Sequence, residues 1–123
     1  MKFLLDTNFL LIPGTFGVDI FTELTKFGKP ELYTIRLVIK ELEKMATGKG
    51  ADARAAKLAL QMITQKNIAI IDTEVDRTDK EIEILSASEG HTVCTQDKAL
   101  IEKLKKKGVR VIGMRQKKYL EEV

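Results

Sequence analysis

The chain has 123 residues, of which 44% are hydrophobic and 32% charged, with a formal net charge of +3 and one cysteine. This composition fits a single globular domain over residues 1–123 and excludes a disordered protein, a disulfide scaffold and a cysteine-rich zinc module. No signal peptide or membrane-spanning run is visible, so we expect a cytoplasmic protein with no membrane partner. Aromatic residues make up only 6%, which argues against base stacking as the main means of binding a ligand.

The first half of the chain predicts two strands and three helices. The apolar run Phe3–Leu5 predicts a buried strand that ends at Asp6, and the pair Pro13-Gly14 predicts a break after it. Apolar residues at helical spacing predict helices over about residues 18–27, 35–47 and 52–65, with a short strand at residues 32–34.

The second half predicts three strands separated by two helices. Buried strands are expected at residues 68–71, 92–95 and 109–112, the last of them the final strand, with helices at about residues 78–89 and 98–107. Thr78 and Glu81 fit a capping box at the start of the first of these helices. Strands and helices alternate throughout, which predicts an α/β fold with a parallel central sheet and helices on both faces.

Acidic residues follow two of the predicted strands. Asp6 directly follows the first strand, and Asp97 lies two residues after Thr95. The carboxyl ends of parallel strands meet at one edge of a sheet, so these side chains are expected near each other. Helical periodicity also turns Asp79 toward the buried side, whereas Asp76 falls off that face.

Each acidic residue has an ordinary structural alternative. Asp79 and Asp97 could be helix N-caps, and Asp6 could form an Asx turn. Glu41 and Glu43 lie on opposite borders of the apolar face of their helix, and periodicity does not choose between them. Several inward carboxylates at one edge would repel each other, however, and a divalent cation such as Mg²⁺ or Mn²⁺ would relieve that repulsion and activate water toward a phosphodiester.

Other catalytic arrangements lack the residues they need. The only histidine, His91, follows Gly90 and is expected in a surface turn, and Cys94 is expected to be a buried, inert thiol. No glycine-rich phosphate loop or dinucleotide fingerprint is present. An aspartate-based phosphotransfer module is also disfavoured, because Asn8 occupies the position where such phosphatases need a second aspartate.

Four segments together resemble the PIN-domain nucleases: Phe3–Asn8, Val38–Leu42, Thr78–Ile82 and Val93–Lys98, which occur in the order of that family and span nearly the whole chain. The resemblance implies a three-layer α/β/α sandwich with a central, mostly parallel sheet, and divalent-metal-dependent endonucleolytic cleavage of RNA. It implies that the catalytic and metal-binding residues are Asp6, Glu41, Asp79 and Asp97, choosing Glu41 over Glu43. It places Asn8 and Thr95 in the same pocket as polar residues, and implies a homodimer in many members.

Basic residues crowd the last quarter of the chain, and they are either a solvated surface or an RNA-backbone contact. If they bind the RNA backbone, the residues that contact it are expected to be Lys98, Lys103, Lys106 and Arg115.

The segment Asp6–Gly14 followed by Phe16–Phe21 is most similar to an archaeal branch related to small-subunit rRNA-processing nucleases, part of which carries toxin names. We favour rRNA processing or general RNA cleavage, with rRNA or mRNA as substrate and a ribosome-assembly partner. The alternatives are a toxin held by an antitoxin and a non-catalytic RNA-binding protein with this fold.

Overall fold

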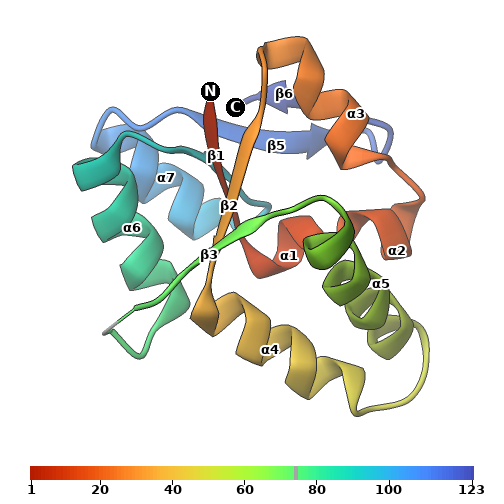
Figure 1. Cartoon of the computed structure of the whole chain (residues 1–123). Coiled ribbons are helices and arrows are strands. Elements are labelled where there is room, and N and C mark those ends of the chain that lie inside the picture. The colour runs from red at the N-terminus through yellow and green to blue at the C-terminus, as the bar shows by residue number, and fades with distance from the viewer. Residues whose placement is uncertain (74) are drawn as a thin grey trace.

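The computed structural model describes residues 1–73 and 75–123 (Figure 1). The strands are β1 (Lys2–Leu5), β2 (Glu31–Ile35), β3 (Ala69–Ile71), β4 (Thr92–Cys94), β5 (Val111–Arg115) and β6 (Tyr119–Glu122). The helices are α1 (Thr7–Leu10), α2 (Ile12–Phe16), α3 (Ile20–Leu24), α4 (Arg36–Ala46), α5 (Ala51–Gln65), α6 (Thr78–Glu89) and α7 (Lys98–Lys106), with a 3-10 turn η1 (Thr25–Phe27).

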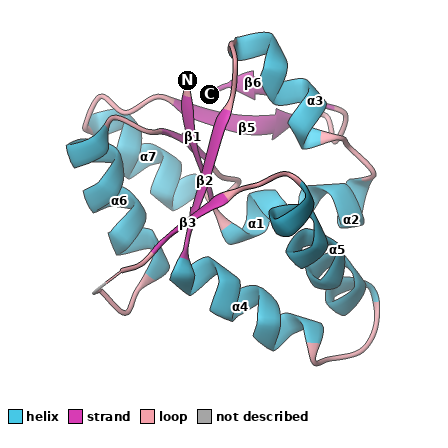
Figure 2. Ribbon diagram, in the orientation of Figure 1, coloured by secondary structure: helices cyan, strands magenta, loops and turns pink. Residues whose placement is uncertain are grey.

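The strands form one sheet in the order β3-β2-β1-β4-β5-β6. All neighbouring pairs are parallel except β5 and β6, which are antiparallel. Figure 2 shows α6 and α7 on one side of the sheet and α1, α2 and α5 on the other. The predicted α/β sandwich with a mostly parallel sheet is therefore confirmed.

The strand order places a switch point between β1 and β4. The chain builds outward from β1 to β2 and β3 on one side, and then restarts on the other side with β4 and β5. Connections diverge at such a point and leave a crevice at the carboxyl ends of the two central strands, where open α/β sheets bind their ligands.

The central strands are apolar on both faces because helices cover both. Phe3, Leu4 and Leu5 of β1 and Val93 and Cys94 of β4 are completely buried. Burial raises the pKa of the Cys94 thiol well above its ordinary value, as expected for an inert thiol. No helix in the described part of the chain is long and apolar enough to cross a lipid bilayer.

One local prediction near the start of the chain is corrected. Pro13 and Gly14 do not break the chain after β1 but lie inside the short helix α2. Pro13 is tolerated in the first turn because the N–H it lacks would have no helical partner there. Leu11 closes α1 and begins α2, so Thr7–Phe16 is almost continuously helical.

Three further predictions are wrong. The run at residues 68–71 gives β3, but this strand is at the edge of the sheet and Ile70 is 36% exposed. The chain ends in β6, which sequence periodicity did not indicate. His91 is buried rather than at the surface, with its ring packed edge-on against Tyr33, and burial lowers its pKa.

Candidate active site

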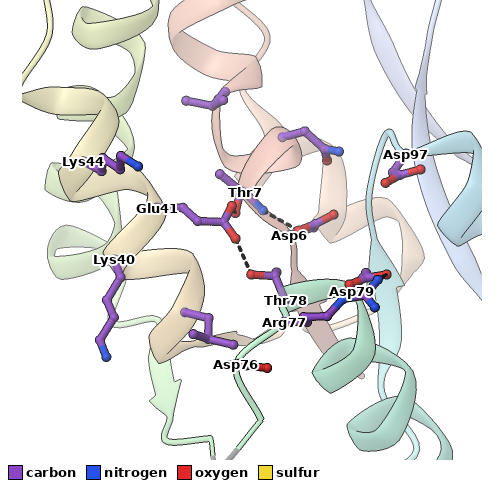
Figure 3. Close-up of a pocket in the computed structure, with 13 residues that line it drawn as sticks. Asp6, Thr7, Lys40, Glu41, Lys44, Asp76, Arg77, Thr78, Asp79 and Asp97 are labelled. Carbon is purple, nitrogen blue, oxygen red and sulfur yellow. Dashed lines mark hydrogen bonds and ion pairs between the residues drawn. The ribbon is translucent and has the colours of Figure 1, made fainter.

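A pocket of about 700 Å³ lies at the carboxyl edge of the sheet, at the switch point. Its lining includes the four acidic residues that the resemblance indicates: Asp6, Glu41, Asp79 and Asp97. They come from four segments, namely the end of β1, helix α4, the start of α6 and the residue before α7. Figure 3 shows Asp6 between Glu41 on one side and Asp97 on the other.

Asp6 lies deepest in the pocket, and its position is fixed by the start of α1. Its Oδ1 accepts a hydrogen bond from the backbone N–H of Thr7 at 2.8 Å, and its Oδ2 accepts one from the Thr95 hydroxyl at 2.7 Å. The residue is only 7% exposed. Burial raises the pKa of this carboxyl, and the nearby charges of Glu41 and Asp97 add to that effect, although the two hydrogen bonds oppose it.

Glu41 is held between two threonine hydroxyls. The Thr7 hydroxyl donates to its Oε2 at 2.7 Å, and the Thr78 hydroxyl donates to its Oε1 (Figure 3). Glu43, two residues along the same helix, is exposed and does not line the pocket. Geometry thus separates two glutamates that periodicity could not.

The predicted capping box at Thr78 does not form. Arg77 occupies the N-cap position of α6 without a side-chain cap, and the Thr78 hydroxyl is directed to Glu41 instead. A capping role is a local interpretation, whereas the actual partner of this hydroxyl, Glu41, is 37 residues away in the chain.

Asp97 has two roles in the structure. Its Oδ1 accepts hydrogen bonds from the backbone N–H groups of Ala99 and Leu100, so the N-cap alternative is confirmed. The same side chain also lines the pocket. A cap and a pocket carboxylate are compatible, because the cap bonds occupy only one of its two oxygens.

The two predicted polar residues differ in their placement. Asn8 lines the pocket, and its Oδ1 accepts a hydrogen bond from the backbone N–H of Gln96 at 3.0 Å. Thr95 is fully buried behind Asp6, where its hydroxyl donates to Asp6 and accepts from the backbone N–H of Asp97 at 3.2 Å. Thr95 therefore supports two acids rather than facing the pocket.

Asp79 forms an ion pair with Arg77, whose Nη2 lies 3.2 Å from its Oδ2. Arg77, Lys40 and Lys44 all line the pocket, so its rim carries positive charge. Sequence reasoning missed these three residues, although Lys44 lies about one turn from Glu41 on the α4 surface. Asp76 also lines the pocket. It lies in the loop before α6, so the helical periodicity that placed it off the buried face does not describe its position.

The predicted RNA-backbone residues lie outside this pocket. Lys98 begins α7 and Arg115 ends β5, so both are at the carboxyl edge of the sheet, and Arg115 pairs with Glu121 at 2.6 Å. Lys103 and Lys106 lie in the last turn of α7, which runs back toward the opposite edge.

The oxygen ligands of the pocket have the chemistry that a hard divalent cation prefers. Carboxylate oxygens are the ligands that Mg²⁺ and Mn²⁺ prefer, and the pocket offers no cysteine or histidine. In the described residues, no group of three or more His, Cys, Asp or Glu side chains is already close enough together to hold an ion. Asp6 nevertheless carries an unfavourable buried charge beside two other acids, which a cation would compensate.

The sequence and fold can now be compared with those of known proteins. Residues 3–117 match the family model described as a PIN like domain. The chain belongs to the PIN-domain family of nucleases. This PIN domain is 33% identical to Ribonuclease VapC4 of Methanocaldococcus jannaschii over 126 residues, which covers 98% of the chain and 95% of that relative.

Two solved structures share the fold of this PIN domain. The PIN domain endonuclease Utp24 matches with a TM-score of 0.79 at 21% identity, over 99% of this chain and 92% of that one. A domain of a functionally unknown protein from Methanocaldococcus jannaschii matches with a TM-score of 0.64 at 17% identity, over 93% and 91% of the two chains.

Proposed function

We propose that this PIN domain is a divalent-metal-dependent endoribonuclease whose catalytic residues are Asp6, Glu41, Asp79 and Asp97. The observation that carries the proposal is the convergence of these four carboxylates on one pocket at the switch point of the sheet. The relative at 33% identity is named a ribonuclease, which supports RNA as the substrate.

The four carboxylates are the residues that would hold Mg²⁺ or Mn²⁺, directly or through water. The ion, when bound, would polarise a phosphodiester and lower the pKa of a water molecule. Thr7 and Thr95 orient the Asp6 oxygens, and the full burial of Thr95 keeps that hydrogen bond away from competing solvent.

Glu41 is the residue best placed to orient the attacking water and accept its proton. Its carboxylate is exposed to the pocket but fixed by two hydroxyl donors, so it is both accessible and preorganised. Hydrolysis in this sense leaves a 5′-phosphate and a 3′-hydroxyl.

The cations at the rim bind the RNA backbone in this proposal. Lys40 and Lys44 flank Glu41, and Arg77 can exchange its ion pair with Asp79 for the scissile phosphate. Lys98 and Arg115 extend the same positive edge, whereas Lys103 and Lys106 lie toward the other end of α7.

The biological role that we favour is processing of rRNA in ribosome biogenesis, in the cytoplasm, with a homodimer as the active assembly. A toxin that cleaves mRNA or rRNA until an antitoxin binds it is the second candidate, and the VapC name of the 33% identical relative favours it. The third, a non-catalytic RNA-binding protein, is disfavoured because all four acids are present and line one pocket.

The test compares two glutamates on the same helix. Wild-type protein should cleave single-stranded RNA in the presence of Mn²⁺, and Glu41→Gln should lower the rate at least about 100-fold. Glu43→Gln is the matched control and should leave the rate unchanged, because Glu43 is outside the pocket. Equal activity of the two variants would remove Glu41 from the mechanism, and metal-independent cleavage would contradict the proposed function.

A further inference from the structure

A second hollow, of about 410 Å³, lies where the turn between β5 and β6 approaches the connection from α2 to α3 (Figure 1). It is lined by Phe16 at the end of α2, by Asp19 and Glu23 at α3, and by Lys117 and Lys118 from the turn. None of these residues lines the acidic pocket. The hollow combines an aromatic ring with lysines, which is the pairing that binds single-stranded nucleic acid.

Phe16 is available to a ligand. Its side chain is 39% exposed, whereas the neighbouring Phe9 is completely buried. The ammonium group of Lys117 lies 5.8 Å from the centre of the Phe16 ring, within the range of a cation–π contact. A base stacked on this ring would therefore lie beside a cation able to bind its phosphate.

The turn that carries Lys117 is held in an unfavourable backbone conformation. The backbone N–H of Lys118 donates to the carbonyl of Arg115 at 3.0 Å, and the two central residues, Gln116 and Lys117, have φ of 52° and 55°. Asn-Gly is the favoured pair at two such positions, because Gly has no Cβ and the side chain of Asn can form local hydrogen bonds, whereas most other residues are strained there. Lys117 thus occupies a position where glycine would relieve backbone strain, and strain of this kind is concentrated at functional sites.

The two acids in the hollow are bound by other partners and not by these lysines. Asp19 accepts hydrogen bonds from Phe21 and Thr22 as the cap of α3, and Glu23 binds Lys26 at 3.0 Å and the backbone N–H of Leu120 at 2.8 Å. Among the described residues, Lys117 and Lys118 form no ion pair.

The hollow is close to the acidic pocket along the chain. Leu11, which lines the acidic pocket, immediately precedes α2, and Phe16 is the last residue of that helix. Asp6 caps α1, and the ten residues from Asp6 to Phe16 correspond to roughly 15 Å at the α-helical rise. An RNA strand with one phosphate at the acids could therefore place a base a few nucleotides away on Phe16.

We propose that Phe16 and Lys117 form a subsite for an unpaired nucleotide of the RNA strand whose backbone enters the acidic pocket, with the base stacked on Phe16 and the phosphate bound by Lys117 and Lys118. The proposal rests on RNA being the substrate. It makes the enzyme selective for unpaired RNA, because a base within a duplex cannot stack on a protein side chain.

Fluorescence of 2-aminopurine, placed at one position at a time in a short single-stranded RNA, tests the stacking. The Asp6→Asn protein serves as the host so that the RNA stays intact. One position should be quenched on binding, and adding Phe16→Leu should remove that quenching and weaken binding about tenfold. Ile84→Ala is the control, since Ile84 is an exposed apolar residue on α6 and should change neither signal. Quenching that survives Phe16→Leu would overturn the proposal.

Lys117→Gly provides a second, independent readout. Relief of the positive φ should raise the melting temperature by a few degrees, while loss of the ammonium group should weaken RNA binding severalfold. A variant that is more stable and binds RNA equally well would show that Lys117 has no such role.

The two proposals can fail separately. If Glu41→Gln still cleaves RNA but Phe16→Leu loses quenching, the role proposed for Glu41 is wrong and the subsite stands. If cleavage depends on Glu41 but Phe16→Leu binds and quenches normally, only the subsite is wrong.

Discussion

At the scale of single residues, Asp6 shows the conflict between stability and function most directly. Burial raises its pKa above the ordinary 3.8, so the folded state penalises the ionised carboxylate. Below pH 3.8 the group is protonated in both the folded and the unfolded state and the penalty is absent. The penalty grows as the pH rises above 3.8 and is complete once the pH exceeds the folded-state pKa.

Replacement of Asp6 by Asn should therefore stabilise the metal-free protein at neutral pH and abolish cleavage. Asn keeps an oxygen for the Thr7 N–H, and the Thr95 hydroxyl can turn to donate to Asn8 Oδ1, which is 3.3 Å away. Thermal melts of both proteins from pH 3 to 8 measure the difference, which should increase with pH. A difference that is constant across this range would show that Asp6 ionisation does not destabilise the fold.

Binding of a divalent cation should make the wild type, and not Asp6→Asn, the more stable of the two proteins. An ion that binds only the folded protein stabilises it by mass action, so Mn²⁺ should raise the melting temperature of the wild type. The same addition should have a much smaller effect on Asp6→Asn. An equal rise in both proteins would place the bound ion elsewhere.

Thr78→Val tests whether the orientation of Glu41 matters. Loss of the hydroxyl should lower kcat about tenfold, as expected when a support of a catalytic carboxylate is removed, with little change in KM. Stability should fall by less than about 1 kcal/mol, because Thr78 does not cap α6. Thr78→Ser keeps the hydroxyl and should restore most of the activity. If Thr78→Val and Thr78→Ser lose activity equally, the hydrogen bond to Glu41 is not the reason.

The sequence revealed the acids of the site better than their supports. Asp6 and Asp97 follow predicted strands, so the rule about strand ends places them together without any structure. Glu41 could be chosen only by family resemblance. The roles of Thr7 and Thr78 could not be predicted, because each hydroxyl bonds Glu41 across more than 30 residues of chain and periodicity contains no information about such partners.

At the scale of secondary-structure elements, Gly14 fixes how closely α2 approaches α5. A Cβ at this position would lie 2.6 Å from the Cα of Ala55 and 2.8 Å from its Cβ. The clash involves backbone, so it cannot be relieved by a side-chain rotation.

Gly14→Ala should accordingly destabilise the protein by about 1–2 kcal/mol, even though alanine is the better helix former by about 1 kcal/mol. Urea unfolding measures the change. Gly48→Ala is the control, because the contact nearest to its Cβ, the Met45 carbonyl oxygen at 3.4 Å, is much less severe. Gly14→Ala as stable as the wild type would mean that the two helices can separate at no cost.

Periodicity located the long elements and failed on the short ones. Helices α4, α5 and α7 each contain enough turns to display a repeating apolar face, and α6 was predicted with its observed bounds. Helices α1 and α2 have only four and five residues, too few to show a repeat. Strand β3 was read as buried because its apolar composition does not reveal that no strand lies beyond it.

At the scale of the whole molecule, the course of each helix relative to the pocket decides which basic residues can reach the substrate. Helices α4 and α7 both start at the carboxyl edge of the sheet, but α4 lines the acidic pocket as far as Lys44 in its last turn, whereas the last turn of α7 does not line it. Lys103 and Lys106 are therefore far along α7, whereas Lys40 and Lys44 line the acidic pocket.

The salt dependence of RNA binding should separate these two pairs. Lys40→Ala with Lys44→Ala should reduce the slope of log affinity against log salt concentration by about 1.4, at 0.7 per lost phosphate contact on a single strand. Lys103→Ala with Lys106→Ala removes the same charge and should leave the slope nearly unchanged. Equal slopes for the two double variants would mean that only net charge matters.

The strand order has one more consequence, which concerns synthesis of the chain. Strand β4 is made after β1, β2 and β3, yet it pairs directly with β1, and only then does Asp97 come beside Asp6. A growing polypeptide therefore has no complete set of acids until Asp97 has been made. Any chemistry that needs all four carboxylates has to wait for the second half of the sheet.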